Sequence, residues 1–451
     1  MSLPTYPHYK DSGVQWLTNV PAHWRVSPLK YLALLKSGGT PSKENLDYWN
    51  GDVPWASAKD LKTELLADTI DHITGFAVES RNADLVPAGT ILVVVRGMIL
   101  ARIFPVAETV VPMAINQDLK GLIPRQDILG RFLAWLLRGS ANESLLRLDE
   151  AGHGTKALRM EAWTSMQLPV PPLDEQSAII AFLDRETGKI DALIAEQEKL
   201  LTLLGEKRQA AISHAVTNGL NPDTPVKDSG VVWLGDIPAH WSVSPLMYLT
   251  DLSRPIMYGI VLPGPNVDTG IPIVKGGDVR PHRLKLNLLN RTTPDIEAPY
   301  ARARLRPSDI VYSIRGTIGD AELVPEELLD TNITQDVARI SPRADIDSRW
   351  LLYAMKSKPV FVQLEQRSLG AAVRGINIFE LKRAQVPLPP SNEQEAIAKF
   401  LDAEVARLNA LSNDAERAIS LLKEHRSALI TAAVTGKIDV RERSLALAAA
   451  A

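Results

Sequence analysis

Two segments of the chain carry the same amphipathic pattern, with the spacing of a long helix. Apolar side chains recur every three or four positions in residues 174–216, and residues 392–434 repeat this pattern in the same phase. Each segment follows a Pro-Pro pair and contains no further proline, so a helix can begin after the pair and continue unbroken. The predicted seam comprises Ile190, Leu193, Gln197, Leu200, Leu204, Lys207 and Ala211, and then Leu408, Leu411, Ala415, Ala418, Leu422, His425 and Leu429. Such long helices need a partner, so the pattern predicts that the two pair with each other as a coiled coil.

The repetition extends beyond the helices. Residues 10–32 return almost unchanged as residues 227–249, and the helical segments match at nearly the same offset, for example Glu175 with Glu393. The chain is therefore a tandem duplication. His23-Trp24 and His240-Trp241 recur within the opening segments. Because these histidines lack neighbouring carboxylate or thiol partners in the sequence, we interpret the pairs as anchors of the opening segment and not as a metal site.

The residues between each opening segment and each helix have diverged but keep a common skeleton. Apolar strands before Arg96-Gly97 and before Arg315-Gly316 correspond, as do Asn116-Gln117-Asp118 and Thr334-Gln335-Asp336. Short strands separated by Gly and Pro, together with one amphipathic helical stretch, are typical of a mixed domain. We predict the α+β class: two mixed α/β domains separated by two long helices that form an antiparallel coiled coil, with an internal pseudo-twofold repeat. The predicted boundaries are 1–173 and 222–391 for the domains, 174–221 and 392–440 for the helical regions, and 441–451 for a tail.

Charge and composition narrow the class of ligand. The formal net charge is −3, but residues 250–385 carry a positive balance in which most of the cations are arginine. A local anionic ligand is compatible with such an uneven distribution. The chain contains no cysteine, and its sequence has neither a bilayer-spanning apolar run nor a signal-peptide pattern at its start. We expect a protein of the cytoplasm that does not act at a membrane.

The sequence contains none of the catalytic motifs that we sought. A phosphate-binding Gly-x-x-x-x-Gly-Lys-Ser/Thr loop, a Gly-x-Gly-x-x-Gly turn, a His-Glu-x-x-His helix and the Asn/Asp-Pro-Pro-aromatic motif of adenine methyltransferases are all absent. We therefore predict a binding protein without catalytic residues, metal ligands or a cofactor of its own.

Arginines at strand ends are the leading candidates for contact with a nucleic acid. Arg96 and Arg315 each precede a glycine after an apolar strand, where the backbone can approach a ligand closely. The guanidinium fork suits guanine O6 and N7 or a phosphate, and the alternative is an ion pair at the strand end. Further candidates lie in predicted loops, where each could instead be a solvated side chain: Lys43, Ser57, Lys59, Lys156, Arg159, Lys275, Arg280, Arg283, Arg374 and Asn377.

These motifs together resemble the specificity subunit of type I restriction-modification systems. The resemblance rests on the repeated Asp-Ser-Gly-Val-x-Trp-Leu…Pro-x-His-Trp segment, on Ser37-Gly38-Gly39-Thr40-Pro41 with Val53-Pro54-Trp55, and on the Pro-Pro-x-x-Glu-Gln…Phe-Leu-Asp helix. It covers the chain to about Val440. The second copy departs from the pattern, since we align Ser253-Arg254-Pro255 with the Ser37–Pro41 loop.

The resemblance implies a non-catalytic DNA-recognition subunit. Two target recognition domains would each read one half of a split asymmetric site in double-stranded DNA, and the helix pair would set the gap between the halves. The partners would be two adenine methyltransferase subunits, which bring S-adenosylmethionine, and two restriction and translocation subunits, which use ATP and Mg²⁺. Ile194, Leu201 and Ile419, which we expect to point away from the seam, are the candidates for methyltransferase docking. The alternative is that they only broaden the seam within the chain. The alternative is a coiled-coil interaction scaffold without DNA specificity.

Overall fold

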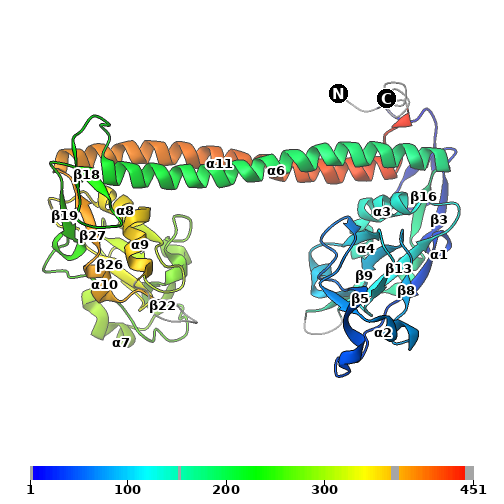
Figure 1. Ribbon diagram of the computed structural model, residues 1–451, viewed down its shortest axis with the longest axis horizontal. Coiled ribbons are helices and arrows are strands. Elements are labelled where there is room, and N and C mark those ends of the chain that lie inside the picture. The colour runs from blue at the N-terminus through cyan, green and yellow to red at the C-terminus, as the bar shows by residue number, and fades with distance from the viewer. Residues whose placement is uncertain (1–3, 151–153, 367–374, 442–451) are drawn as a thin grey trace. The chain divides into compact units, whose positions relative to one another are not determined.

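The computed structural model describes residues 4–150, 154–366 and 375–441 and divides the chain into two compact units. The first unit comprises Met1–Gln197 and Arg417–Ala451, and the second comprises Glu198–Glu416. Each unit contains one globular part and half of each long helix, α6 (Leu173–Asn218) and α11 (Ser391–Val434) (Figure 1). Each globular domain predicted from the sequence therefore forms a compact unit with residues of both long helices.

Helices α6 and α11 pair in antiparallel orientation (Figure 1). In the first unit, Arg426 Nε donates to Asp191 Oδ1 at 2.8 Å. In the second unit, Arg208 Nη1 donates to Asn409 Oδ1 at 2.8 Å. Asp191, nearer the N-terminus of α6, contacts Arg426, nearer the C-terminus of α11, and the order is reversed for Arg208 and Asn409. This confirms the predicted antiparallel coiled coil. No described helix is long and apolar enough to cross a membrane.

The phase of the seam differs from the prediction. Leu193, Leu200 and Leu411, which we placed in the seam, are 52%, 40% and 43% exposed. The neighbouring Ile194 and Leu201 are half-buried instead, as is Ile419, which corrects the expectation that these three point outward. The prediction rested on the spacing of three and four residues, which Ile194 and Leu201 satisfy as well as Leu193 and Leu200 do. Each helix also packs against its globular part, for example through Ile194, and this shifts the buried face by one residue.

The globular parts of the two units share a common strand order, with one strand fewer in each of these two sheets of the second unit. The first contains a sheet with the order β4-β13-β9-β11-β6 and a second sheet with the order β7-β5-β12-β8. The second contains β20-β26-β23-β24 and β22-β21-β25. The first unit's strands are β4 (Ala33–Ser37), β5 (Trp49–Ala56), β6 (Leu65–Leu66), β7 (Asp71–Ile73), β8 (Leu85–Val86), β9 (Ile91–Val94), β11 (Val106–Thr109), β12 (Met113–Ile115) and β13 (Leu119–Pro124). Those of the second are β20 (Met257–Tyr258), β21 (Ile271–Val274), β22 (Asn290–Thr292), β23 (Ile310–Ser313), β24 (Ala321–Leu323), β25 (Asn332–Ile333) and β26 (Val337–Ile340).

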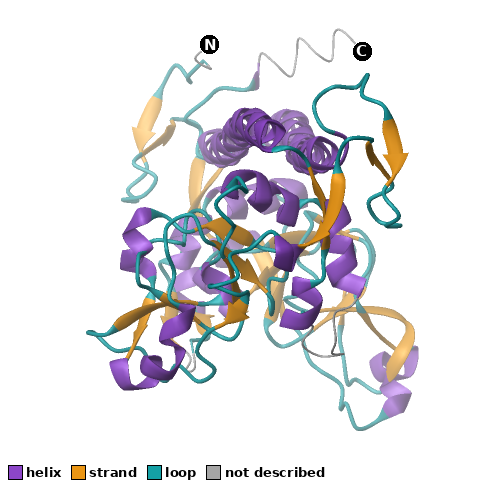
Figure 2. Cartoon of the chain, turned by 90° about the vertical axis from the view of Figure 1, so that its left-hand side faces the viewer, coloured by secondary structure: helices purple, strands orange, loops and turns teal. Residues whose placement is uncertain are grey.

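One amphipathic helix covers the sheet of each unit. Helix α3 (Gly130–Gly139) packs on β9, β11 and β13, and helix α8 (Ser348–Lys356) packs on β24. Both helices bury an unbroken apolar run around Trp135 and Trp350, each 0% exposed. Figure 2 faces the second unit and shows its α-helices and strands beside the helix pair, which is seen end-on. The mixed α+β class is confirmed.

Each opening segment is fastened to the start of a long helix through a glutamate. Glu175 accepts hydrogen bonds from Trp24 Nε1 at 2.9 Å and from Tyr6 Oη at 3.1 Å, and it pairs with His23 Nε2 at 2.5 Å. Glu393 pairs in the same way with Trp241 Nε1 at 2.9 Å and His240 Nε2 at 2.6 Å. The predicted anchor is therefore present. Its carboxylate partner lies about 150 residues away in the sequence, which is why we did not find it there.

The register of the sheets corrects our alignment of the two copies near residue 255. Ser37 lies opposite Lys120 in the first unit, and Tyr258 lies opposite the equivalent Ala338 in the second. A Cβ added to Gly38 would meet Ile115 O at 2.1 Å, and one added to Gly259 would meet Ile333 O at 1.9 Å. The Ser37–Thr40 loop therefore corresponds to Tyr258–Val261 and not to Ser253–Pro255. Both copies require glycine here because the backbone approaches a neighbouring strand too closely for a side chain.

Candidate nucleic-acid interface

An arginine and a glutamine lie at the same edge of the sheet in each unit. In the first unit, Val95 N donates to Asp118 O at 2.8 Å, which holds the turn containing Gln117 beside Arg96. In the second unit, Ile314 N donates to Asp336 O at 2.9 Å and holds Gln335 beside Arg315 in the same manner. The same backbone contact thus positions an Arg–Gln pair twice. Both side chains offer hydrogen-bond donors for base edges or phosphates.

A returning segment completes each edge. Strand β10 (Arg96–Gly97) pairs with β15 (Lys156–Leu158), so Arg96 lies opposite Ala157. In the second unit, Arg315 forms an isolated bridge with Gly375. A Cβ added to Gly375 would lie 3.4 Å from Arg315 Cγ, so the arginine side chain passes directly over this glycine. Backbone pairing therefore fixes the base of both arginines while their guanidinium groups are exposed.

The edge of the second unit is hollowed into a cavity of about 690 Å³. Its walls combine the Arg–Gln pair with the loop that follows β20 and with the start of α10 (Ile378–Lys382). The lining residues are Tyr258, Val261, Ile314, Arg315, Gln335, Gly375, Ile376, Asn377 and Ile378. Two residues that we predicted from the sequence, Arg315 and Asn377, therefore share one cavity with Gln335.

The predicted basic residues fall into two groups, those without an ion-pair partner and those paired with a carboxylate. Among the described residues, Lys43, Arg96, Lys275 and Arg315 have no carboxylate partner within ion-pair distance, which removes the strand-end ion pair as an explanation for Arg96 and Arg315. The other predicted cations that the structure describes are paired. The ion pairs are Lys59 with Asp71 at 2.7 Å, Lys156 with Glu150 at 2.6 Å, Arg159 with Asp149 at 3.6 Å, Arg280 with Asp320 at 3.4 Å and Arg283 with Asp278 at 3.4 Å.

Two predicted polar residues have local structural roles. Ser57 is 8% exposed, and its hydroxyl donates to Asp60 Oδ2 at 2.7 Å within a turn. Asn377 caps α10, because its side chain accepts from Phe379 N at 2.9 Å. Arg374 and part of the glycine-rich loop 152–156 lie outside the described residues. Ser57 is therefore part of the scaffold, whereas Asn377 lines the cavity and caps a helix at once.

Gln117 and Gln335 are the residues that sequence reasoning missed. We had used Asn116-Gln117-Asp118 and Thr334-Gln335-Asp336 only to align the two copies. Their repetition within otherwise diverged segments was the available signal, because a polar residue kept in both copies at an exposed turn has no role in the core. The structure adds the second part of the signal, since both glutamines border the arginines.

Much of the positive charge of residues 250–385 stabilises the fold. Arg254 pairs with Asp309 at 2.8 Å, and Arg304 pairs with Glu297 at 2.8 Å. Arg339 is 1% exposed and donates to three backbone carbonyl groups, those of Arg302, Arg304 and Pro255. Burial, reinforced by nearby Arg254, lowers the pKa of Arg339 to about 10. The charge balance of the segment therefore overstates the charge that it offers to a ligand.

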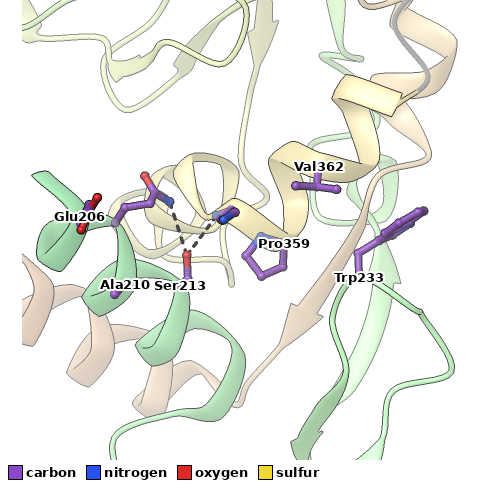
Figure 3. A pocket seen from close by; sticks show the side chains of 8 residues that line it. Glu206, Ala210, Ser213, Trp233, Pro359 and Val362 are labelled. Carbon is purple, nitrogen blue, oxygen red and sulfur yellow. Dashed lines mark hydrogen bonds between the residues drawn. The ribbon is translucent and has the colours of Figure 1, made fainter.

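Another cavity of the second unit has a different character. It has a volume of about 590 Å³ and lies between α6, the start of α9 (Lys358–Gln366) and the opening segment. Trp233, Pro359 and Val362 line it together with Glu206 (Figure 3). Ser213 Oγ accepts from Lys358 N at 3.1 Å at its floor. The lining is mostly apolar and its two charged residues, Glu206 and Lys358, have opposite signs. It offers no net positive charge to a nucleic-acid backbone, so we exclude this cavity from the interface. The described residues also contain no cluster of His, Asp or Glu able to hold a metal ion.

Comparison with known proteins gives one consistent family. The family model for the type I restriction modification DNA specificity domain matches residues 21–202 and 266–420. The chain is similar to the EcoBI specificity subunit of Escherichia coli, with 30% identity over 339 residues that cover 74% of this chain and 71% of that protein.

Two solved structures share the fold. One is a chain from work on complex assembly and conformational transition of the type I R-M system, with a TM-score of 0.68 and 18% identity over 92% of this chain and 98% of that chain. The other is the HsdS subunit from Thermoanaerobacter tengcongensis, with a TM-score of 0.50 and 18% identity over the same shares of the two chains.

Proposed function

Because the chain belongs to the type I restriction-modification DNA specificity family, we propose that each unit reads one half of a split, asymmetric sequence in double-stranded DNA. The observation that carries this proposal is the repeated Arg–Gln edge within two diverged frames. Each unit presents the same Arg–Gln pair, but the residues around the pair differ between the units. This arrangement suits two half-sites that are related but not identical. Loops at this edge would read base edges in the major groove, while phosphate contacts fix the register.

The chain's own role in this proposal is binding. Methyl transfer and DNA cleavage belong to partner subunits, as do the cofactors S-adenosylmethionine, ATP and Mg²⁺. The bound DNA lies in the cytoplasm, where we expect the complex to act. The alternative, a coiled-coil scaffold without DNA specificity, leaves the exposed and unpaired Arg96 and Arg315 without a role, so we favour DNA recognition.

Substitution of the two arginines tests DNA recognition. We expect Arg315→Ala, assembled with the methyltransferase subunit, to bind its DNA site about ten- to hundredfold more weakly, because a bidentate arginine–guanine pair contributes about 1–3 kcal/mol. If the arginine contacts a phosphate, the loss should instead be uniform across sequences and the salt slope should fall by about one. Fluorescence anisotropy with labelled duplexes at several salt concentrations measures both quantities.

The matched control removes an arginine that has another partner. Arg407 pairs with Glu404 at 2.7 Å on α11, so Arg407→Ala lowers the charge by the same amount away from the proposed interface. We expect its affinity for DNA to stay unchanged. Equal losses for Arg407→Ala and Arg315→Ala would indicate non-specific attraction and would contradict the proposal.

We further propose two equivalent docking sites for methyltransferase subunits on the helix pair. Leu193 and Leu421 are 52% and 58% exposed in the first unit. Their counterparts in the repeat, Leu411 and Leu203, are 43% and 51% exposed in the second unit. Large apolar side chains that recur on a surface through a duplication suit a contact with a repeated partner. One such pair in each unit supports a stoichiometry of two.

The position of these leucines within the heptad supports docking on the uncovered side of the helix pair. Asp184 flanks the seam on the side of the globular part, because it accepts from Trp135 Nε1 at 2.9 Å. Leu193 flanks the seam on the opposite side, given that Ile190 is buried and Ile194 is half-buried. The contact between Asp191 and Arg426 places Leu421 within about one helical turn of Leu193 along the pair.

The second unit repeats this arrangement. Asp402 accepts from Tyr353 Oη at 2.9 Å on the side of its globular part. Leu411 and Leu203 flank the seam on the other side at the heptad positions of Leu193 and Leu421. Restriction and translocation subunits would then join through the methyltransferases.

A further inference from the structure

We infer that Gln335 reads an adenine in the half-site bound by the second unit, whereas Gln117 in the first unit presents only its amide NH₂ group and reads a base acceptor. This inference deepens the proposed DNA recognition and rests on it. It concerns two side chains at equivalent positions, of which only Gln117 has a threonine hydroxyl beside it, that of Thr40.

The two glutamines occupy the same place in their units. Gly39 N donates to Ile115 O at 2.9 Å, and Ile260 N donates to Ile333 O at 2.8 Å, so the loops that border the two glutamines run in register. This register makes Thr40 and Val261 equivalent. Any difference between the two glutamines therefore arises from their neighbours and not from a different backbone position.

The neighbour in the first unit orients the amide. Thr40 Oγ1 donates a hydrogen bond to Gln117 Oε1. Because the oxygen is turned toward Thr40, the Nε2 group points away and offers two donors to a ligand. Gln117 is exposed. An amide held in this way matches base atoms that only accept, namely guanine O6 and N7 or thymine O4.

The second unit lacks this constraint. Val261 has no hydroxyl group, and the side chain of Gln335 has no hydrogen-bond partner among the described residues. Both Nε2 and Oε1 are therefore available. An amide with one free donor and one free acceptor matches adenine, which accepts at N7 and donates from N6, and this bidentate pairing is the usual way in which glutamine reads a base.

The cavity of about 690 Å³ leaves room for a base edge beside Gln335. Gly375 contributes to this room, because the side chain of Arg315 lies across it where a Cβ would stand 3.4 Å from Cγ. Tyr258 borders the cavity and is 48% exposed, whereas the equivalent position in the first unit is Ser37. The half-site of the second unit is therefore read by a glutamine that shares its cavity with Tyr258 and Arg315.

Genome-wide mapping of methylated adenine tests the inference in cells that express the chain with its methyltransferase subunit. For the wild-type chain we expect a split motif with a required adenine in one half. Gln335→Ala should relax that single position, with a ten- to hundredfold loss of discrimination between adenine and the other bases. Gln117→Ala, the matched variant, should relax one position in the other half and leave the adenine unchanged.

Exchanging the neighbours separates readout from general damage, because both glutamines are kept. Val261→Thr supplies the missing hydroxyl, so the preference for adenine should fall about tenfold or more. Thr40→Val should give Gln117 a new tolerance for adenine. Binding to duplexes with 7-deazaadenine at the mapped position, which lacks the N7 acceptor, should weaken for the wild-type chain and not for Gln335→Ala.

The outcomes distinguish this inference from the proposed function. A wild-type complex that methylates a split motif, together with a Gln335→Ala variant of unchanged motif, would overturn the role of Gln335 and leave DNA recognition intact. Insensitivity of the wild-type chain to 7-deazaadenine would overturn the bidentate pairing in the same way. A wild-type complex that produces no split motif would instead contradict the proposed function.

Discussion

Replacing Leu193 and Leu421 together by aspartate is expected to reduce the number of methyltransferase subunits that the chain holds from two to one. Burying a charged side chain without a partner in an apolar contact costs several kcal/mol, which is enough to lower an affinity by a thousandfold or more. The site in the second unit keeps Leu203 and Leu411 and should retain its partner. Native mass spectrometry of the assembled complex measures the stoichiometry directly.

Three matched variants complete this experiment. Leu203→Asp with Leu411→Asp should also leave one partner, and the four substitutions combined should leave none. Ala192→Asp adds the same charge at an exposed position of α6 outside the proposed contact, so this variant should retain both partners. Two bound methyltransferase subunits on the Leu193→Asp, Leu421→Asp chain would rule out this docking surface.

Glu64→Ala is expected to destabilise the first unit by about 2 kcal/mol, because it leaves the largely buried Arg138 without its carboxylate partner. Glu64 lies within 3.3 Å of Arg131 Nη2, 3.6 Å of Arg138 Nη1 and 2.5 Å of Arg426 Nη2. All three guanidinium groups also lie over the ring of Trp135, at 4.8–5.8 Å from its centroid. This network joins α3 to α11 within the first unit.

The pH dependence of this effect follows from the pKa of Glu64. Burial favours the protonated form, but Arg138, Arg426 and Arg131 outweigh it and hold the pKa of Glu64 below its ordinary value. Burial also lowers the pKa of Arg138 to about 10, which Glu64 partly offsets. A carboxylate with a lowered folded-state pKa contributes its full stability above its unfolded pKa of about 4.3. The difference between wild type and Glu64→Ala should therefore be constant at neutral pH and shrink as the pH falls through the folded-state pKa.

Hydrogen exchange of the α3 amides reports the stability of the first unit. Asp71→Ala is the control, because it removes the carboxylate partner of Lys59 from an exposed pair and should cost no more than about 1 kcal/mol. Equal effects of Glu64→Ala and Asp71→Ala would show that the arginine network does not stabilise the unit. An effect of Glu64→Ala that stayed undiminished as the pH fell through the lowered folded-state pKa of Glu64 would contradict the assigned role of its charge.

The architecture was predictable because the duplication made each half a guide to the other. Repeated proline-free amphipathic segments predicted α6 and α11, and their antiparallel pairing is present. The phase of the seam was not predictable from hydrophobicity, because the exposed Leu193 is as apolar as the half-buried Ile194. Which of two neighbouring residues is buried depends on the globular part that packs against the helix, and this packing is not a local property.

The candidate site was predictable only in part, for a related reason. Arg96 and Arg315 were found because a basic residue after a buried strand projects from a fixed position. Gln117 and Gln335 were not, because their significance lies in strand connections that bring separate turns to one edge. Arginines such as Arg254 and Arg339 cannot be distinguished from ligand-binding arginines by sequence. Arg254 binds the carboxylate of Asp309 and Arg339 binds the carbonyl group of Pro255, and both partners lie more than 50 residues away in the sequence.

The measurement that tests the central claim most directly is mapping of methylated adenine after exchange of one recognition segment. Residues 250–385 of this chain would be replaced by the equivalent segment of a relative, and the chimera would be expressed with the methyltransferase subunit. We predict that one half of the split motif changes while the other half is kept. A motif that stays the same in both halves, or changes in both, would contradict the reading of one half-site by each unit.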